Sequence, residues 1–210
     1  MGRPRRFDES GLLDAAIELF WSKGFDSTSV EDVSAVTGVG NGSIYAAFGN
    51  KKGLFLAAFA RYCERRAQFV SETVRAAPGS ARAAVRTLLR SVIDDCAAQP
   101  GRRGCLLINS IAELGGRIPE VVTIGNRATT AMEEAVAERL RPTMSPGGEA
   151  ELSALSANII LVSQGLILFS RLGTPRPRLL EIADISCAAL PTPWADQLTP
   201  LANETVALDK

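Results

Sequence analysis

The chain has 210 residues, of which 46% are hydrophobic, and its 23 basic and 23 acidic side chains give a formal net charge of zero. This length can bury one large core or two smaller ones. Zero net charge argues against a protein coated in nucleic acid but allows a local basic footprint. Histidine is absent, which excludes Ser-His and Cys-His catalysis and histidine-based metal sites.

The remaining features of the composition point to an intracellular protein without cofactors. No apolar segment follows a basic N-terminus, so no signal peptide is predicted. The most apolar run, 157–169, is interrupted by Asn158, Ser163 and Gln164, and it is shorter than the roughly 20 residues of a membrane span. We therefore expect a cytoplasmic protein with no membrane partner. Its four cysteines form no close pair, so we expect no metal and no cofactor.

Helical periodicity runs through nearly the whole chain, and we expect an all-α fold of about nine helices. Asp8 or Ser10 is placed to cap a first helix that Gly24 ends. Ser29 then begins a short second helix, because Asp32 follows it at capping-box spacing. The buried side of this second helix is expected to comprise Val30, Val33 and Val36, and its end is expected at Gly38.

A third short helix is expected at about 41–48, with Ile44 and Phe48 one turn apart on its inner side. Asn50 is placed to cap a long fourth helix. Prolines and glycines divide the rest into five further helices, expected at about 81–98, 105–114, 119–141, 149–172 and 178–190.

The second and third helices have the layout of a helix-turn-helix, in which a glycine-containing turn joins two short helices. The outer side of the third helix is small or polar, as a helix entering the major groove requires. Tyr45 can reach a phosphate, and Lys51 adds a cation at a helix N-terminus. A basic arm precedes the first helix and either contacts DNA or forms a solvated terminus. The DNA contacts predicted from these residues are Arg3, Arg5, Arg6, Asn41, Gly42, Ser43, Tyr45, Ala46 and Lys51.

The stretches Gly24 to Val33 and Gly38 to Phe55 resemble the DNA-binding domain of TetR-type (TetR/AcrR) transcriptional regulators. About fifty residues carry this resemblance, including the run Gly-Ser-Ile-Tyr-Ala-Ala-Phe-Gly-Asn-Lys at 42–51. The resemblance implies DNA contacts from Thr28, Ser29, Asn41, Ser43, Tyr45 and Lys51. Two positions depart from the family: Gly40 replaces a frequent capping Ser or Thr, and Ala46 and Ala47 replace bulkier residues.

The resemblance and the pattern together predict three regions. Residues 1–53 are expected to form the helix-turn-helix domain with its basic arm, 54–190 a helical effector-binding and dimerisation domain, and 191–210 a proline-containing tail. The last two helices are apolar over much of their circumference, so one side of each should face a second copy of the chain. The residues predicted for this dimer interface are Leu155, Ile159, Val162, Leu166, Phe169, Leu180 and Ile185.

An effector pocket is expected among the helices between about Phe55 and Arg141. Its inventory is mainly apolar and indicates a small hydrophobic or amphipathic ligand. The residues predicted to line it are Tyr62, Phe69, Cys96, Cys105, Leu107, Asn109, Ile111, Glu113 and Met132, each of which could instead be plain core.

The sequence therefore predicts a repressor that dimerises on a near-palindromic operator of double-stranded DNA and is released by a small apolar effector. An alternative regulator would sense oxidants or electrophiles through Cys105, because a helix N-terminus and the preceding Arg102 and Arg103 favour thiolate. Cys105 could instead be a buried small apolar residue. Alternatives of another class are an enzyme, which would have to use carboxylates or a cysteine, and a helical adaptor that does not bind DNA.

Overall fold

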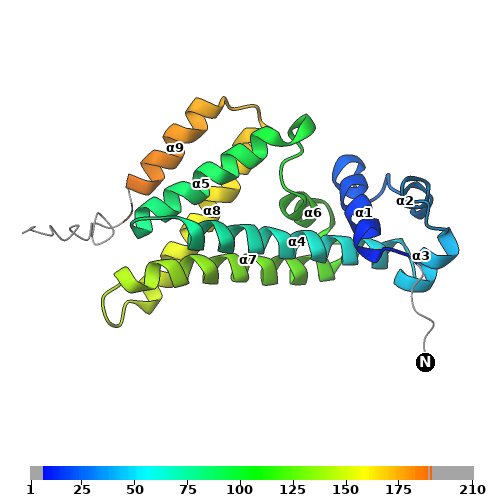
Figure 1. Cartoon of the computed structure of the whole chain (residues 1–210), viewed down its shortest axis with the longest axis horizontal. Helices are drawn as coiled ribbons and strands as arrows, with labels where there is room; N and C mark the ends of the chain where they lie inside the picture. The colour runs from blue at the N-terminus through cyan, green and yellow to red at the C-terminus, as the bar shows by residue number, and fades with distance from the viewer. Residues whose placement is uncertain (1–6, 189, 191–210) are drawn as a thin grey trace, which may run out of the picture.

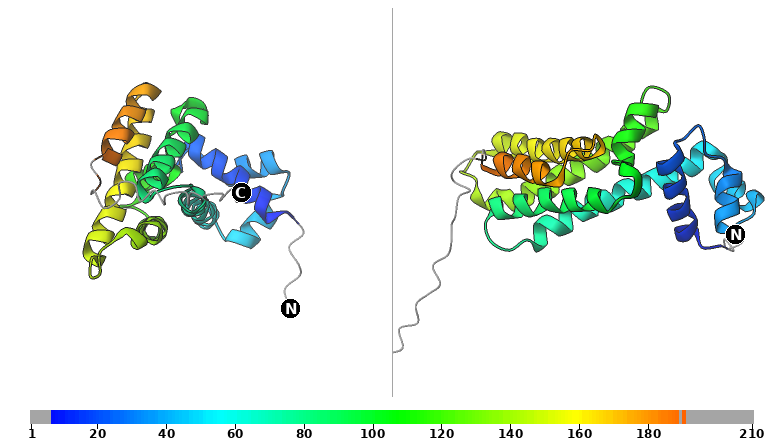
Figure 2. Two further views of the ribbon diagram at one scale, coloured as in Figure 1. Left: turned by 60° about the vertical axis from the view of Figure 1, so that its left-hand side comes forward. Right: turned by 90° about the horizontal axis from the view of Figure 1, so that it is seen from above.

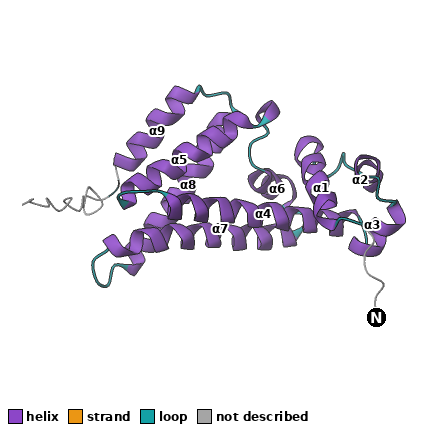
Figure 3. Cartoon of the chain, in the orientation of Figure 1, coloured by secondary structure: helices purple, strands orange, loops and turns teal. Residues whose placement is uncertain are grey.

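The computed structural model describes residues 7–188 and 190, and every regular element within them is helical (Figure 3). Nine α-helices lie in this part of the chain, as expected from the periodicity. They are α1 (Glu9–Lys23), α2 (Val30–Thr37), α3 (Asn41–Phe48), α4 (Lys51–Ala76), α5 (Ala81–Ala98), α6 (Leu106–Leu114), α7 (Pro119–Leu140), α8 (Glu149–Arg171) and α9 (Arg176–Ala188). Single 3₁₀ turns lie at Pro100–Arg102 and Arg141–Thr143.

The helices form a small unit and a larger bundle that share the long helix α4 (Figure 1). Helices α1, α2 and α3 gather around the beginning of α4, and α7 lies along much of the rest of α4. Helices α5, α8 and α9 pack together at the other end of the molecule, as the two further views also show (Figure 2). Because α4 is continuous, a displacement in the bundle can be transmitted to the small unit.

Side-chain caps begin helices α2 and α4, as the sequence predicts. At the start of α2, Ser29 Oγ accepts a hydrogen bond from the Asp32 amide (3.0 Å), and Asp32 Oδ2 accepts one from the Ser29 amide (2.8 Å). This confirms the capping box. Gly38 ends α2 with φ of +71°, a conformation that favours glycine. Asn50 Oδ1 accepts from the Gly53 amide (2.9 Å) at the start of α4.

The core of the small unit contains Val30 and Val33 of α2 together with Ile44 of α3. The prediction that Val36 joins this buried side is wrong, because its side chain is 64% exposed. Steps of three residues fall short of a full 3.6-residue turn, so each step rotates by about 60°. Val36 is consequently about 120° away from Val30 and lies outside the buried stripe.

A cluster of phenylalanines joins the small unit to α4. The Phe20 ring meets the Phe55 ring edge to face, with 5.1 Å between their centroids, and Phe25 meets Phe55 at 5.1 Å in the same manner. Phe59 stacks on Phe55 at 5.7 Å. Such edge-to-face and offset arrangements suit the quadrupoles of the rings. The cluster therefore fixes the end of α1 against the first turns of α4.

Helix α8 combines length with an apolar composition, with a mean hydropathy of 1.8 over an 18-residue window. By length and composition alone it could cross a membrane, a test that the core helix of a soluble protein also passes. The helix passes because it extends beyond the 157–169 run, which is itself shorter than a membrane span. In this fold α8 packs against α5, α7 and α9, although only 39% of the window is buried.

Candidate nucleic-acid interface and cavity

Helix α3 presents the small polar surface predicted for a recognition helix. Ile44 is only 1% exposed and anchors the helix to the unit, whereas Gly42, Ser43, Tyr45 and Ala46 are exposed. No side chain caps the helix at Gly40, consistent with the departure noted in the sequence. These four exposed residues lie on the side of the helix opposite Ile44. Because they are small or polar, a base edge or phosphate can approach this side closely.

Asn41, at the start of α3, is only partly available in this structure. Its Nδ2 lies 3.5 Å from Glu31 Oε1 of α2, at the limit of a hydrogen bond. Its Oδ1 is buried and has no hydrogen-bond partner within the described residues. The amide is therefore held against α2, and contact with a base would require a change of its rotamer.

Three other predicted DNA contacts are occupied by internal bonds. Thr28 is 1% exposed and its hydroxyl donates to the Gly24 carbonyl (2.8 Å), so the prediction of a side-chain contact with DNA is wrong. The Lys51 ammonium donates to the carbonyls of Phe25 (3.0 Å) and Asp26 (3.3 Å), so its expected contact with a phosphate, which stays a prediction, would compete with these bonds. Ser29 is half-buried, and its hydroxyl serves the capping box.

The sequence predicts that a basic arm formed by Arg3, Arg5 and Arg6 contacts DNA. These three residues lie outside the described part of the chain. Within 7–53 the sequence holds three lysines, no arginine and seven carboxylates. Lys23 is paired with Asp32 (3.2 Å) and Lys52 with Glu120 (2.7 Å). Together with Lys51, every basic side chain of this segment is thus engaged within the molecule.

Several charged contacts join the small unit to the bundle. Arg117 donates two hydrogen bonds to the Asp26 carboxylate, at 2.8 and 2.9 Å, and this pairing lowers the pKa of Asp26. Arg103 pairs with Glu18 of α1 (2.6 Å), and its guanidinium lies 4.2 Å from the centre of the Trp21 ring. With the Lys52–Glu120 pair, these contacts surround the junction between the two parts.

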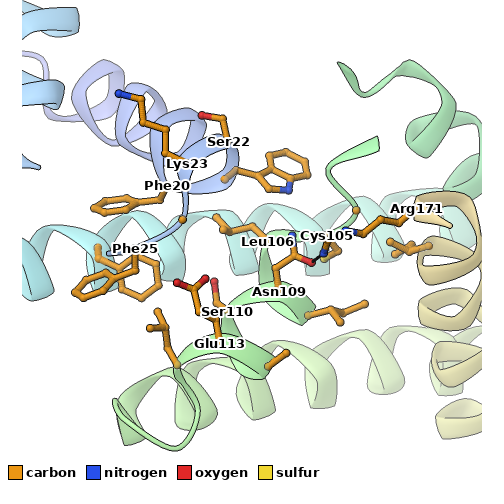
Figure 4. A pocket seen from close by; sticks show the side chains of 18 of the residues that line it. Phe20, Ser22, Lys23, Phe25, Cys105, Leu106, Asn109, Ser110, Glu113 and Arg171 are labelled. Carbon is orange, nitrogen blue, oxygen red and sulfur yellow. Dashed lines mark hydrogen bonds between the residues drawn. The ribbon is translucent and has the colours of Figure 1, made fainter. Parts of the chain in front are cut away.

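A cavity of about 580 Å³ lies at this junction (Figure 4). The end of α1, helix α6 and the end of α8 contribute most of its wall. Figure 4 shows Ser110 and Glu113 on the side of the Phe20 and Phe25 rings, whereas Asn109, Cys105 and Arg171 lie at the other end. A volume of this size suits an organic ligand of ordinary effector dimensions.

The predicted pocket residues only partly coincide with this cavity. Cys105, Asn109 and Glu113 line it, but the remaining six do not: Tyr62, Phe69, Cys96, Leu107, Ile111 and Met132. Leu107 and Met132 are core side chains, and Cys96 borders a separate hollow of about 220 Å³ beside α9. The prediction overlooked Phe20, Trp21, Lys23 and Phe25, because helical patterning marks them as parts of the small unit, and Arg171 because it is distant in sequence.

Cys105 lies on the cavity wall, but in surroundings different from those predicted. It is 7% exposed, and the Tyr62 hydroxyl lies 3.3 Å from its Sγ. Arg103 is directed to Glu18 and Trp21, and the guanidinium of Arg102 lies beside Gly173. The expectation that these two arginines act on the thiol is therefore wrong, because the loop turns both side chains toward other partners.

The predicted dimer residues on α8 and α9 are divided between surface and core. Phe169 and Ile185 are exposed, and Leu155, Val162 and Leu180 are half-buried. Ile159 and Leu166 are at most 3% exposed, so they are wrongly assigned to an interface, because they face α8's neighbours within the chain. Three leucines that the prediction did not include are also exposed: Leu161, Leu168 and Leu172.

Nothing in the described part of the chain resembles a metal centre. No three acidic or cysteine side chains gather there as ligands would. The thiols are unpaired within the same residues, and burial raises the pKa of Cys96 to about 11. Neutral thiols of this kind behave as small apolar groups.

Comparison with known proteins gives the same assignment to the N-terminal unit. Residues 12–58 match the model of a family described as bacterial regulatory proteins, tetR family. The chain is 29% identical to the HTH-type transcriptional regulator YezE of Bacillus subtilis (strain 168), over 90% of this chain and 100% of that protein. It is 28% identical to the HTH-type transcriptional repressor ComR of Escherichia coli (strain K12), over 87% and 88% of the two chains.

Solved structures show the same arrangement of helices. A cysteine mutant of the TetR family regulator CifR, in complex with 26-bp double-strand operator DNA, is 29% identical with a TM-score of 0.71. The match covers 90% of this chain and 100% of that chain. The regulatory protein TetR from Rhodobacter sphaeroides, at 22% identity, has a TM-score of 0.70 over 84% and 95% of the chains and shows the likeness of fold alone.

Proposed function

Since the chain is a TetR-type DNA-binding transcriptional regulator and not an enzyme, we propose that it is a homodimeric repressor released from its operator by a small, mainly apolar effector. The observation that carries this proposal is the exposed α3 surface of Gly42, Ser43, Tyr45 and Ala46 above the buried Ile44. In the proposed division, residues 1–53 bind DNA, 54–190 bind the effector and the partner subunit, and 191–210 form a tail. Its place of action is the cytoplasm, where its operator is.

The second subunit is proposed to cover the exposed apolar side of α8 and α9. Leu161, Leu168 and Leu172 are separated by seven and four residues and therefore share one side of α8. Exposed Phe169 and Ile185 extend this apolar surface. An isologous pairing of two helices from each subunit would bury these residues. It would also explain why α8 is apolar beyond the needs of its own core.

Dimerisation gives the recognition helices a use that one copy lacks. Two copies of α3 separated by about 34–36 Å can read successive major grooves on one face of the duplex. The operator is accordingly proposed to be near-palindromic, with one half-site for each subunit. Contacts from Ser43 and Tyr45 would be repeated in each half-site.

The cavity at the junction is the proposed effector site, because its wall contains residues from both parts of the chain. A ligand there contacts Phe20 and Phe25 of the small unit as well as Ser110 and Glu113 of α6. An effector shifts an equilibrium only if it binds one arrangement more tightly than another. Filling the space between α1 and α6 favours one spacing of the recognition helices, and a coupling of about 1–3 kcal/mol is typical of such switches.

A second candidate function, sensing electrophiles through Cys105, is favoured by the position of its thiol on the same cavity wall. An adduct at Sγ would occupy the cavity and could displace the Tyr62 hydroxyl, which also accepts from the Leu106 amide (3.3 Å). In this version Cys105→Ala abolishes induction by an electrophile, with Cys187→Ala as the control. Unchanged induction of the Cys105→Ala protein removes this candidate.

A gel shift with the DNA that flanks its gene tests the principal proposal. The purified protein should retard this DNA, with an affinity that falls as salt rises, and should sediment as a dimer. Leu168→Glu combined with Leu172→Glu should give a monomer of unchanged helicity with much weaker operator binding, whereas Glu151→Gln, on the exposed start of α8, should change neither property. A protein that is monomeric, or that binds flanking and unrelated DNA equally, contradicts the proposal.

A further inference from the structure

The cavity wall holds a carboxylate without a close partner. In the described part of the chain, Glu113 makes no hydrogen bond and no ion pair within 4 Å, and its side chain is exposed toward the cavity. Its Oε1 lies 3.5 Å from the position that a Cβ on Gly24 would take. Glu113 therefore lies against the residue at which α1 ends, and Figure 4 shows its carboxylate on the side of Phe20 and Phe25.

The end of α1 adds negative charge at the same place. The last carbonyl groups of a helix lack intrahelical partners, and the dipole of the helix gives its C-terminus a partial negative charge. Ser22, Lys23 and Gly24, the last residues of α1 and its cap, all line the cavity. A carboxylate beside a helix C-terminus is repelled by it, and a cation between them would relieve this repulsion.

The basic groups near the cavity form their close pairs with residues other than Glu113. Lys23 is bound to Asp32 (3.2 Å). Arg117, three residues after the end of α6, is held by both oxygens of Asp26, and its charge interacts with that of Glu113 without a hydrogen bond. Arg171 donates to Asn109 Oδ1 at the opposite end of the cavity, beside Cys105 (Figure 4). The Glu113 end is thus locally acidic, although the cavity as a whole is not.

The same end of the cavity is rich in aromatic surface. Phe20, Phe25 and Phe55 lie together there. Trp21 also lines the cavity, nearer to Cys105, where its ring contacts Tyr62 and Arg103. Aromatic rings attract cations through their quadrupoles and bury the apolar body of a ligand. Ser110, one turn before Glu113 on α6, supplies a hydroxyl that can accept a hydrogen bond from an ammonium group.

We propose that the effector of this regulator is an organic cation, an ammonium group attached to an apolar body. Its charge would lie between Glu113, Ser110 and the terminal carbonyls of α1, and its body among the aromatic rings. The proposal rests on the proposed function only in treating the cavity as the effector site. A bound ammonium joins α6 to α1, and this bridge would hold the small unit in the arrangement that does not fit the operator.

Three probes that share a phenylbutyl group but differ in charge distinguish the effect of charge on affinity from that of hydrophobicity. They are 4-phenylbutylamine, 4-phenylbutanol and 4-phenylbutyrate. Calorimetry with the full-length protein at neutral pH should give an amine affinity at least about 10-fold above those of the alcohol and the acid, equivalent to about 1.4 kcal/mol. In a Trp194→Phe background Trp21 is the remaining tryptophan. Saturation of its fluorescence change by the amine would place the probe in this cavity.

Glu113→Gln should reduce the amine affinity to that of the alcohol and leave the alcohol affinity unchanged. The matched control is Glu134→Gln on the exposed side of α7, which should preserve the preference for the amine. Equal or tighter binding of the acid, absence of saturable amine binding, or an unchanged amine affinity in Glu113→Gln with native helicity overturns the proposal. Operator binding without any probe is measured separately, so a protein that binds the amine but no DNA would contradict only the repressor function.

Discussion

The DNA affinity of this protein should depend on the arginines that precede α1 to an unusual degree. Residues 7–53 carry seven carboxylates against three lysines. Each lysine is engaged: Lys23 with Asp32, Lys51 with backbone carbonyls, and Lys52 with Glu120. The recognition surface on α3 contains no charged side chain. We therefore expect the cations that release counterions from the phosphates to come mainly from Arg3, Arg5 and Arg6.

The size of the effect follows from counterion release. Each phosphate neutralised by a cation contributes about 0.9 to the slope of log affinity against log salt. If all three arginines reach phosphates, each subunit contributes a slope of about 2.7, and a dimer about 5.4. At a salt concentration of about 0.15 M, three such contacts correspond to roughly a 150-fold gain in affinity per subunit.

The test compares the wild type with a protein in which Arg3, Arg5 and Arg6 are replaced by alanine. Fluorescence anisotropy with labelled operator, repeated over a series of salt concentrations, should show most of the slope lost. The control removes three distant exposed arginines, Arg75, Arg127 and Arg178, and so changes the net charge equally. A slope that stays within about 0.5 of the wild-type value would refute the reasoning and indicate that a lysine of the small unit leaves its internal partner on DNA.

Three further predictions concern the small unit. Tyr45→Phe and Ser43→Ala should each weaken operator binding by about 0.5–1.5 kcal/mol through loss of one hydrogen bond, while exposed Ser153→Ala on α8 should leave anisotropy titrations unchanged. Ile44→Ala should lower the free energy of unfolding by about 2–5 kcal/mol, because the residue is fully buried. Exposed Val36→Ala should stay within about 0.5 kcal/mol in the same urea titrations, and equal losses would contradict the burial. Hydrogen bonds from the Ser29 amide and hydroxyl and from Lys23 lower the pKa of Asp32 from 3.8 to about 2. The stabilisation from ionised Asp32 is thus complete above about pH 4 and lost as the pH falls through about 2, so Asp32→Asn should flatten the pH dependence of the urea midpoint in this window; an unaltered dependence would refute the assignment.

The order and limits of the helices could be predicted because their determinants are local. The Ser29–Asp32 capping box, the Asn50 cap and the glycine at 38 each act within a few residues, and a 3.6-residue period identifies the sides that pack. The prediction for Val36 was wrong because three residues spaced by three were assigned to the same buried side of the helix. Three apolar residues at this spacing do not show whether all three lie in the buried stripe or whether the last one lies outside it.

The chemistry of the site depends on contacts between residues that are distant in sequence. Local sequence patterns do not predict such contacts. Arg102 and Arg103 precede Cys105 directly, yet one lies beside Gly173 and the other against Trp21 and Glu18. Lys51 has the sequence context of a phosphate ligand, but the carbonyls of the α1–α2 loop bind its ammonium first. The cavity likewise arises from α1, α6 and α8, whose separation in sequence conceals that Glu113 faces the end of α1. In a protein with equal numbers of positive and negative side chains, we therefore expect binding to use the few charges that form no hydrogen bond or close ion pair inside the fold, and the Glu113 carboxylate is one of these among the described residues.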